Sequence, residues 1–457
     1  MIKRTLQKIA DMIKVESDLS QFKDTVISGV SIDSRKIAKG NLFVPFKGEH
    51  SDGHQYVVSA IQNGAAAALW QKDVPNPPQD LPILVVEDTL LALQELAREY
   101  RNSLDVKVVG ITGSNGKTTT KDMTANLLSI QYKVQKTEGN YNNEIGLPLT
   151  ILGLEEDTEI AVLEMGMSSR GEIDFLTRLA RPEATIITNI GESHLLDLGS
   201  REGIAEAKME IANGLLENGL FVYYGDEPLL KEKVQSLRSN VIKKTFGRSE
   251  KNDIFPIAIE QTDNGCTFTV NRSNIEFVLP VLGTHNVLNA LAAMTVADYF
   301  GVPFEKLNDG FSELKLTNMR TELVQGKNGE KIINDAYNAS PTSMHAAIEL
   351  ISNLPGYENK ILVLGDMLEL GPQEEEFHLK MGESIDSQKI DYVFTFGTLG
   401  ELIAKGAEMN FPSERVHAFT EKQSLIKQLQ KLVDAETIVL VKASRGMKLE
   451  EVVKGLQ

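Results

Sequence analysis

Short apolar runs alternate with helix-like stretches in the middle of the chain. Four runs rich in β-branched and aromatic residues stand out, at 105–112 (DVKVVGIT), 159–165 (EIAVLEM), 184–190 (ATIITNI) and 219–224 (GLFVYY). Uninterrupted apolar runs of this kind are typical of strands that are buried on both faces of a parallel sheet. Helical stretches such as 121–130 (KDMTANLLSI) separate them. This alternation predicts a doubly wound α/β sheet.

The same alternation recurs on both sides of this region. After residue 315, strand candidates at 331–337, 360–366, 392–397, 415–419 and 437–443 are each followed by a helical stretch, which predicts a second, Rossmann-like α/β domain. Before residue 105, strands are expected at 30–35 and 41–46, and a helix followed by a strand at 56–69. We therefore predict three domains, at 1–104, 105–314 and 315–457. The first is a smaller α/β domain and the second holds the P-loop-type sheet described below.

Three further segments carry distinct patterns. Leu6, Ile9 and Ile13 recur at helical spacing, so residues 1–15 are expected to form an amphipathic helix and not a signal peptide. Residues 253–281 alternate in polarity and are expected to form a hairpin insert, whereas 284–300 has a strong helical pattern.

Length and charge limit the class of protein. The 457 residues correspond to about three domains at ~150 residues each. A net charge of −17 argues against a general nucleic-acid binder, which needs a basic surface. Cys266 is the only cysteine, which excludes an intramolecular disulfide. With no apolar run of about 18 residues and no export signal, we expect a cytoplasmic protein that does not enter a membrane. We also expect a monomer.

The strongest chemical signal is a glycine-containing loop between a predicted strand and a predicted helix. Gly113, Ser114, Asn115, Gly116, Lys117, Thr118 and Thr119 follow the strand 105–112. Backbone amides of such a loop bind phosphate, the lysine reaches the β- and γ-phosphates and the threonine hydroxyl binds Mg²⁺. The strict P-loop pattern has glycine six residues before the lysine, where this chain has Ile111. The loop is therefore a shortened variant, and a plain strand-to-helix turn is the alternative.

Three titratable residues lie near the ends of predicted strands or on an apolar helix face. Glu164 ends the strand 159–165, and His194 follows the strand 184–190. Ligands bind at this edge of open α/β sheets, although Glu164 also fits a solvated loop acid and His194 a capping or core histidine. Lys208 shares a helix face with Ile204, Ile211 and Leu215. A lysine there is either paired, modified or extended toward solvent.

Asparagines gather in two places. Asn140, Asn142 and Asn143 belong to the segment GNYNNEIGLP, where they fit either ligand contacts or turn chemistry. His285, Asn286 and Asn289 lie at the start of the predicted helix 284–300. Asn286 fits a helix cap, and Asn289, one turn later, fits a ligand contact better.

These motifs together resemble the Mur ligases, the ATP-dependent amide ligases of peptidoglycan precursor synthesis. TGSNGKTT at 112–119, Glu164, His194, Lys208 and GTHNVLN at 283–289 occur in the family's order, and the resemblance covers essentially the whole chain. DAYNASP at 335–341, LGDMLELG at 364–371 and KASR at 442–445 resemble the member that joins D-alanyl-D-alanine to a UDP-N-acetylmuramoyl-tripeptide. Ser340 and Ala443 depart from its usual Asn and Gly.

The resemblance implies roles for individual residues. Thr118, Glu164, His194 and Lys208 would be ligands of Mg²⁺ at two sites, with Lys208 carbamylated, and Lys117, Glu164, His194 and Lys208 would be catalytic. His285, Asn286 and Asn289 would contact the adenine side of ATP, and Arg320 and Asp335 would reach it from the third domain. The pocket for the UDP-linked substrate would include Ser34, Arg35, Lys47, Asp52, His54, Asn140 and Asn143. The third domain would also bind the dipeptide.

Two alternatives remain at this point. The family member that adds the third residue usually carries Asp-Tyr-Ala-His where this chain has DAYNASP, and its diaminopimelate-adding form carries an Asp-Asn-Pro-Arg run that is absent here. Outside this class, a P-loop protein can use ATP as a switch for partner binding. That reading leaves Glu164, His194 and Lys208 unexplained.

Overall fold

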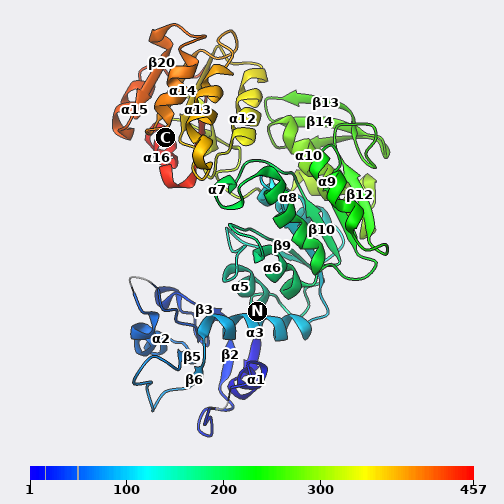
Figure 1. Ribbon diagram of the computed structural model, residues 1–457, viewed down its shortest axis with the longest axis vertical. Helices are drawn as coiled ribbons and strands as arrows, with labels where there is room; N and C mark the ends of the chain where they lie inside the picture. Colours follow the sequence, from blue (N-terminus) through cyan, green and yellow to red (C-terminus); the bar gives the residue numbers. More distant parts are fainter. Residues whose placement is uncertain (16, 49–50) are drawn as a thin grey trace.

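The computed structural model describes residues 1–15, 17–48 and 51–457 and contains three α/β units in chain order (Figure 1). The N-terminal unit lies at the bottom of the view, the central unit in the middle and the C-terminal unit at the top. Among the described residues, none of the helices combines the length and the apolar character needed to cross a membrane.

The N-terminal unit is built on a small parallel sheet in the order β3-β4-β5-β6, and β1 pairs antiparallel with β2 beside it. Its elements are β1 (Lys3–Thr5), α1 (Leu6–Met12), β2 (Val26–Ser28), β3 (Val30–Ser31), β4 (Leu42–Phe43), α2 (Val57–Gln62), β5 (Ala67–Gln71), β6 (Ile83–Val86) and α3 (Thr89–Asn102). The Asp88 side chain accepts the N–H of Leu91 and so starts α3. This helix packs on the central unit, where Tyr100 Oη donates to Leu154 O at 2.8 Å.

The central unit contains a six-stranded parallel sheet in the order β12-β11-β10-β7-β9-β8. Its strands are β7 (Lys107–Thr112), β8 (Val134–Lys136), β9 (Ile160–Glu164), β10 (Ala184–Ile187), β11 (Leu220–Tyr224) and β12 (Ile242–Phe246). Its helices are α4 (Lys117–Leu128), α5 (Gly146–Leu152), α6 (Glu172–Ala180), α7 (Leu195–Leu198), α8 (Arg201–Met209), α9 (Pro228–Lys233), α10 (Thr284–Tyr299) and α11 (Leu307–Ser312). Helices on both faces confirm the doubly wound α/β prediction.

The C-terminal unit has a second six-stranded sheet, in the order β16-β17-β21-β18-β19-β20. Only β16 runs antiparallel to its neighbour. The elements are β16 (Glu322–Gln325), β17 (Lys331–Asp335), α12 (Pro341–Asn353), β18 (Asn359–Gly365), α13 (Glu374–Glu383), β19 (Tyr392–Phe396), α14 (Gly400–Ala407), β20 (Val416–Phe419), α15 (Lys422–Leu429), β21 (Thr437–Lys442) and α16 (Glu450–Leu456). Each strand candidate from this part of the sequence forms a strand, which confirms the Rossmann-like prediction.

The structure differs from the sequence-based expectations at several places. The strands expected at 41–46 and 184–190 are shorter, at Leu42–Phe43 and Ala184–Ile187. The N-terminal helix begins only at Leu6, because residues 3–5 pair with β2 as a strand. The strand expected at 30–35 ends at Ser31, since the Asp33 side chain accepts the N–H of Arg35 and starts a short 3₁₀ helix. The insert at 253–281 is a three-stranded antiparallel sheet, not a hairpin: β13 (Pro256–Thr262), β14 (Gly265–Val270) and β15 (Ser273–Leu279).

Candidate active site

The glycine-containing loop lies at the carboxyl end of β7 and leads directly into α4. A Cβ on Gly113 would lie 1.8 Å from Thr188 Oγ1, and a Cβ on Gly116 would lie 2.6 Å from Asn289 Oδ1. Both glycines also have positive φ, so a larger residue at either position would clash and strain the backbone. The loop therefore lies closely against Thr188, directly after β10, and against Asn289 of α10.

Residues after β10 fix the conformation of this loop. Asn189 Oδ1 accepts the N–H of Asn115 at 2.9 Å, and Asn189 Nδ2 donates to Asn115 O at 3.1 Å. Ser114 Oγ accepts the N–H of Gly191 at 2.8 Å. Because β9, β7 and β10 are neighbours, Glu164, the loop and Asn189 meet at one edge of the sheet, next to the point where the strand order reverses. Ligands of doubly wound folds bind at this edge.

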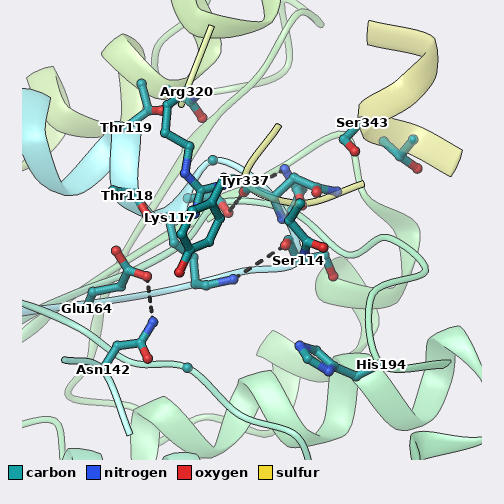
Figure 2. Close-up of a pocket in the computed structure, with 18 of the residues that line it drawn as sticks. Ser114, Lys117, Thr118, Thr119, Asn142, Glu164, His194, Arg320, Tyr337 and Ser343 are labelled. Carbon is teal, nitrogen blue, oxygen red and sulfur yellow. Dashed lines mark hydrogen bonds between the residues drawn. The ribbon is translucent and has the colours of Figure 1, made fainter. Parts of the chain in front are cut away.

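Lys117 lies between two sets of polar side chains. Its Nζ donates to Gly113 O at 2.7 Å, and Figure 2 shows Glu164 and Asn142 on one side of it and His194 on the other. Partial burial and the charge of Arg320 lower the pKa of Lys117, and Glu164 acts against that shift.

The Glu164 carboxylate is buried, and only one of its two oxygens has a hydrogen-bond partner among the described residues. Its Oε1 accepts a hydrogen bond from Asn142 Nδ2 at 2.8 Å, while its Oε2 has no hydrogen-bond partner among the described residues. A buried carboxylate oxygen without a partner is costly unless something binds it. This oxygen and the Thr118 hydroxyl are hard ligands of the type that suits Mg²⁺, so the chemistry of the pair fits that ion.

Lys208 is 1 % exposed and lies in α8, beside the buried Ile204 and Ile211. Burial, together with the nearby Lys117, lowers its pKa well below the usual lysine value. The apolar face expected from the sequence is therefore present. The side chain does not extend to solvent, which removes the alternative of an exposed lysine head.

His194 immediately precedes α7 in an uncommon left-handed conformation, with φ 63°. Burial and the charges of Lys117 and Lys208 lower its pKa, while Glu369 opposes this. Nδ1 lies 2.9 Å from Glu369 Oε2 but is not aligned for a hydrogen bond. Lys117, His194 and Lys208 thus disfavour one another's charged forms, and an anion beside them would relieve the repulsion.

The C-terminal unit contributes the opposite wall. Arg320 Nη2 donates to Thr118 Oγ1 at 3.3 Å, and its guanidinium lies 3.9 Å from the centre of the Tyr337 ring. Asp335 and Lys442 end the paired strands β17 and β21 in the same register, and Lys442 Nζ lies 2.5 Å from Asp335 Oδ2. Two residues far from the loop in sequence therefore face it across the pocket.

The start of α10 forms a further side of the site. Asn286 Nδ2 donates to Leu282 O at 2.8 Å, and Asn289 Nδ2 donates to Asn286 Oδ1 at 2.9 Å. Burial lowers the pKa of His285 to about 4, so its ring is neutral at neutral pH. Gly283 is the N-cap of α10 and no side chain caps the helix, so Asn286 does not play the capping role that was one of its alternatives; both asparagines line the pocket.

These groups surround one cavity of about 690 Å³. Of the residues singled out from the sequence, it is lined by Ser114, Asn115, Gly116, Lys117, Thr118, Thr119, Asn143, Glu164, His194, Lys208, His285, Asn286, Asn289, Arg320 and Asp335. Within the described part of the chain, no three His, Cys, Asp or Glu side chains are close enough together to hold a metal ion. Glu164 and His194 therefore do not belong to a group of three such side chains, and the assignment of Thr118, Glu164, His194 and Lys208 as metal ligands stays a prediction.

The remaining candidates lie outside this cavity. Ser34 and Arg35 are in the 3₁₀ helix Ser34–Lys36, where Arg35 makes two 2.9 Å hydrogen bonds to Asp33. Lys47 is 3.8 Å from Asp73, and Asn140 is exposed. Residues 49 and 50 of the segment 46–54 fall outside the described residues.

His54 and Asn143 both make local contacts within the fold, and for Asn143 this is the turn chemistry given as one of its alternatives. The His54 ring is buried, with Nδ1 2.6 Å from Asp52 Oδ1 and Nε2 accepting the N–H of Gln71 at 3.0 Å. Both ring nitrogens are thus hydrogen-bonded within the fold, and the role of His54 as a substrate contact stays a prediction. Asn143 Oδ1 accepts the N–H of Gly146 at 2.9 Å where α5 begins.

Sequence reasoning missed several contacts at the cavity. Asn189, Tyr337, Glu369 and Lys442 all line it. Each lies inside or next to a motif already noted, but no role followed from its position in the sequence. Only the pairing of distant strand ends brings them to the loop.

Three family models match the chain. A model described as Mur ligase family, catalytic domain, matches residues 26–101; Mur ligase middle domain matches 111–297; and Mur ligase, glutamate ligase domain, matches 319–445. A relative from Bacillus subtilis (strain 168), named UDP-N-acetylmuramoyl-tripeptide–D-alanyl-D-alanine ligase, is 53% identical over 456 residues, which is 100% of this chain and 99% of the relative.

Two solved structures are similar over nearly their full length. A crystal structure of MurF from Acinetobacter baumannii has a TM-score of 0.90 and 30% identity, and the match covers 100% of this chain and 99% of that one. MurF ligase from Thermotoga maritima in complex with ADP has a TM-score of 0.83 and 32% identity, covering 96% of this chain and 98% of that one.

Proposed function

The chain belongs to the Mur ligase family, and we propose that it is the ATP-dependent ligase that joins D-alanyl-D-alanine to UDP-N-acetylmuramoyl-tripeptide in peptidoglycan precursor synthesis. The observation that carries the proposal is full-length identity of 53% to a relative of that name. The cavity supports it, because the phosphate-binding type of loop faces Arg320 and Asp335 of the C-terminal unit.

ATP makes the substrate carboxylate reactive. A carboxylate does not react with an amine at neutral pH, because its oxygen is a poor leaving group. In the first step a carboxylate oxygen attacks the γ-phosphorus, the bond from that phosphorus to the bridging oxygen breaks, and ADP leaves. Lys117 and Arg320 carry the positive charge that stabilises the transferring phosphoryl group.

In the second step the free amine of the dipeptide attacks the acyl phosphate carbon. The tetrahedral intermediate collapses, the carbon–oxygen bond to phosphate breaks, and the nitrogen loses its proton. This yields the amide, ADP and phosphate. The protein contributes mainly positioning and charge compensation in a partly closed cavity.

Mg²⁺ would be held at two positions, one by Thr118 and Glu164 and the other by His194 and Lys208. When bound, the ion neutralises phosphate charge and orients the substrate carboxylate. Lys208 would serve as a ligand after carbamylation: its neutral nitrogen attacks CO₂, the nitrogen–carbon bond forms as one carbon–oxygen π bond opens, and the nitrogen loses one proton. The resulting carbamate carries two oxygens on the carbon bonded to that nitrogen. The lowered pKa of Lys208 supports this, because only the neutral amine reacts with CO₂.

The units take separate parts in the proposed reaction. Residues 1–104 bind the UDP-linked substrate, together with Asn140 and Asn143 of the central unit. Residues 105–314 bind ATP, and residues 315–457 close on ATP and bind the dipeptide. The substrate contacts in the first unit are Ser34, Arg35, Lys47, Asp52 and His54. His285, Asn286 and Asn289 contact the adenine side. The cytoplasmic location and the monomeric state expected from the sequence stay predictions.

Phosphate release from ATP tests the proposal. The full-length protein is incubated with ATP, Mg²⁺ and a UDP-N-acetylmuramoyl-tripeptide, with and without D-alanyl-D-alanine, and the product is identified by mass. We expect sustained release only with the dipeptide. Phosphate release at the same rate with and without the dipeptide would favour an ATP switch. Ligation of a single third amino acid onto a UDP-muramoyl dipeptide would indicate the family member that adds the third residue.

A further inference from the structure

A buried carboxylate lies one helical turn beyond the phosphate-binding loop. Asp122 is 1 % exposed and belongs to α4, four residues after Thr118. Residues four apart lie on the same helix face, about 6 Å apart along the axis. Asp122 does not line the cavity, so none of the proposed steps uses it.

The two oxygens of Asp122 have different partners. Oδ1 faces two cations, with Lys136 Nζ at 2.6 Å and Lys121 Nζ at 3.2 Å. Oδ2 accepts two hydrogen bonds from Thr317, one from its N–H and one from its hydroxyl, each at 2.9 Å. The lysines hold the carboxylate in one orientation, which leaves Oδ2 directed at Thr317.

Thr317 belongs to the linker 313–321 between α11 and β16, which joins the central and C-terminal units. Three residues later, Arg320 donates to Thr118 Oγ1. The linker therefore contacts α4 at two points on one helix face: Thr317 at Asp122 and Arg320 at Thr118.

The backbone on both sides of Arg320 is constrained. Met319 and Thr321 have φ of 59° and 53°, a conformation that is uncommon for residues other than glycine and costly for a β-branched one. The N–H of Thr321 is bound by Asp335 Oδ1 at 3.1 Å. Asp122 and Asp335 thus fix the two ends of the bend that presents Arg320 to the cavity.

We propose that Asp122 is a positioning residue: through Thr317 it holds the linker on α4, so that Arg320 reaches the phosphate end of the ATP site. The inference rests on the proposed ATP-dependent reaction. It assigns a nucleotide-binding function to a contact outside the cavity.

The test uses Thr317, because the buried Asp122 is surrounded by lysines and its loss would endanger folding. Thr317→Val removes the hydroxyl and keeps the shape, whereas Thr317→Ser keeps the hydroxyl. Thr262→Val is the matched control, since Thr262 Oγ1 donates to Gly265 O in the turn between β13 and β14, outside the cavity. The affinity of each full-length variant for a non-hydrolysable ATP analogue with Mg²⁺ is measured by calorimetry, alone and combined with Arg320→Ala.

We expect Thr317→Val to weaken nucleotide binding roughly two- to tenfold, the effect of one hydrogen bond, while Thr317→Ser and the control stay near wild type. With Arg320→Ala already present, Thr317→Val should add almost nothing, because the residue acts through Arg320. The same loss in both backgrounds, or no loss in either, would overturn the proposal. Should Thr317→Val fold poorly, Thr317→Ala takes its place in the same cycle.

This test does not depend on the acceptor. Nucleotide affinity is measured without D-alanyl-D-alanine. A failed ligation assay would therefore overturn the proposed function, whereas the affinities of the Thr317 and Arg320 variants would still test the role of Asp122.

Discussion

Replacing Lys208 by methionine should separate stability from activity. The lysine side chain is 1 % exposed, and its pKa is lowered by burial and by Lys117. Burying a polar group without a hydrogen-bond partner costs roughly 1–3 kcal/mol. Methionine has a similar unbranched shape without the amine, so Lys208→Met should leave the free energy of unfolding unchanged or raise it by up to about 2 kcal/mol.

The same substitution should nearly abolish turnover. Loss of one group that stabilises transition-state charge typically costs about 100- to 1,000-fold in rate. Lys208→Ala should be similarly inactive, and formate or acetate should partly restore it by occupying the oxygen positions of the carbamate. Lys208→Arg should not be rescued, because it keeps a positive charge.

Urea unfolding and phosphate release are the two assays. Unfolding is measured first in Mg²⁺-free, CO₂-stripped buffer, where burial of the unmodified amine destabilises the wild type most. Adding Mg²⁺ and bicarbonate should then stabilise the wild type and not Lys208→Met, since only the native lysine gains a ligand. Destabilisation of the methionine variant by more than about 1 kcal/mol, or near-normal ligation by it, would refute this account of the lysine.

The pH dependence in CO₂-stripped buffer has a definite sign. The unfolded lysine titrates near 10.5 and the folded one well below that value. Between the two, the unfolded chain binds a proton that the folded chain lacks, so the free energy of unfolding of the wild type rises with pH. The advantage of Lys208→Met should therefore be greatest at the lower end of this range and shrink as the pH approaches 10.5.

Three further outcomes are expected. Lys117→Ala should lose about 100-fold or more in ligation rate while its urea midpoint stays near wild type, because the half-buried side chain packs no apolar core. Arg320→Lys should raise the KM for ATP about tenfold, since an ammonium cannot replace a planar guanidinium stacked on Tyr337; an unchanged KM would argue against that contact. The free energy of urea unfolding should be lower at pH 5 than at pH 7.5, in part because of His378. Burial lowers the pKa of this histidine, and its Nε2 accepts the N–H of Met367, so protonation at low pH favours the unfolded chain. His378→Gln should reduce the difference in stability between the two pH values.

The sequence predicts most strands because their burial has a local signature. The runs at 159–165 and 437–443 become β9 and β21, since a strand covered on both faces must be apolar throughout. Very short strands do not have this apolar signature and are not predicted in this way. β3 has only two residues, and the polar cap at Asp33 decides where it ends.

The site is only partly predictable for a related reason. Lys117 and Thr118 belong to a contiguous motif, so their proximity follows from the local sequence. Asn189 and Lys442 reach the cavity because strands far apart in sequence are neighbours in the sheets, and no local pattern encodes that pairing. His54 lies in a family-like segment that predicts a substrate contact, and only the fold shows that its ring nitrogens are hydrogen-bonded to Asp52 and Gln71.

The contacts between the central and C-terminal units bear directly on nucleotide binding. Ser340 Oγ donates to Asn115 Oδ1 in the loop at 3.3 Å, and Thr342 Oγ1 donates to Glu192 Oε2 at 2.7 Å. Both contacts come from the start of α12, so moving that helix disturbs the phosphate-binding loop and the segment after β10 together. Lys117, His194 and Lys208 repel one another when charged, and bound phosphate would remove that repulsion. Nucleotide binding and the approach of the two units should therefore favour each other, because each is completed by groups that the other brings into place.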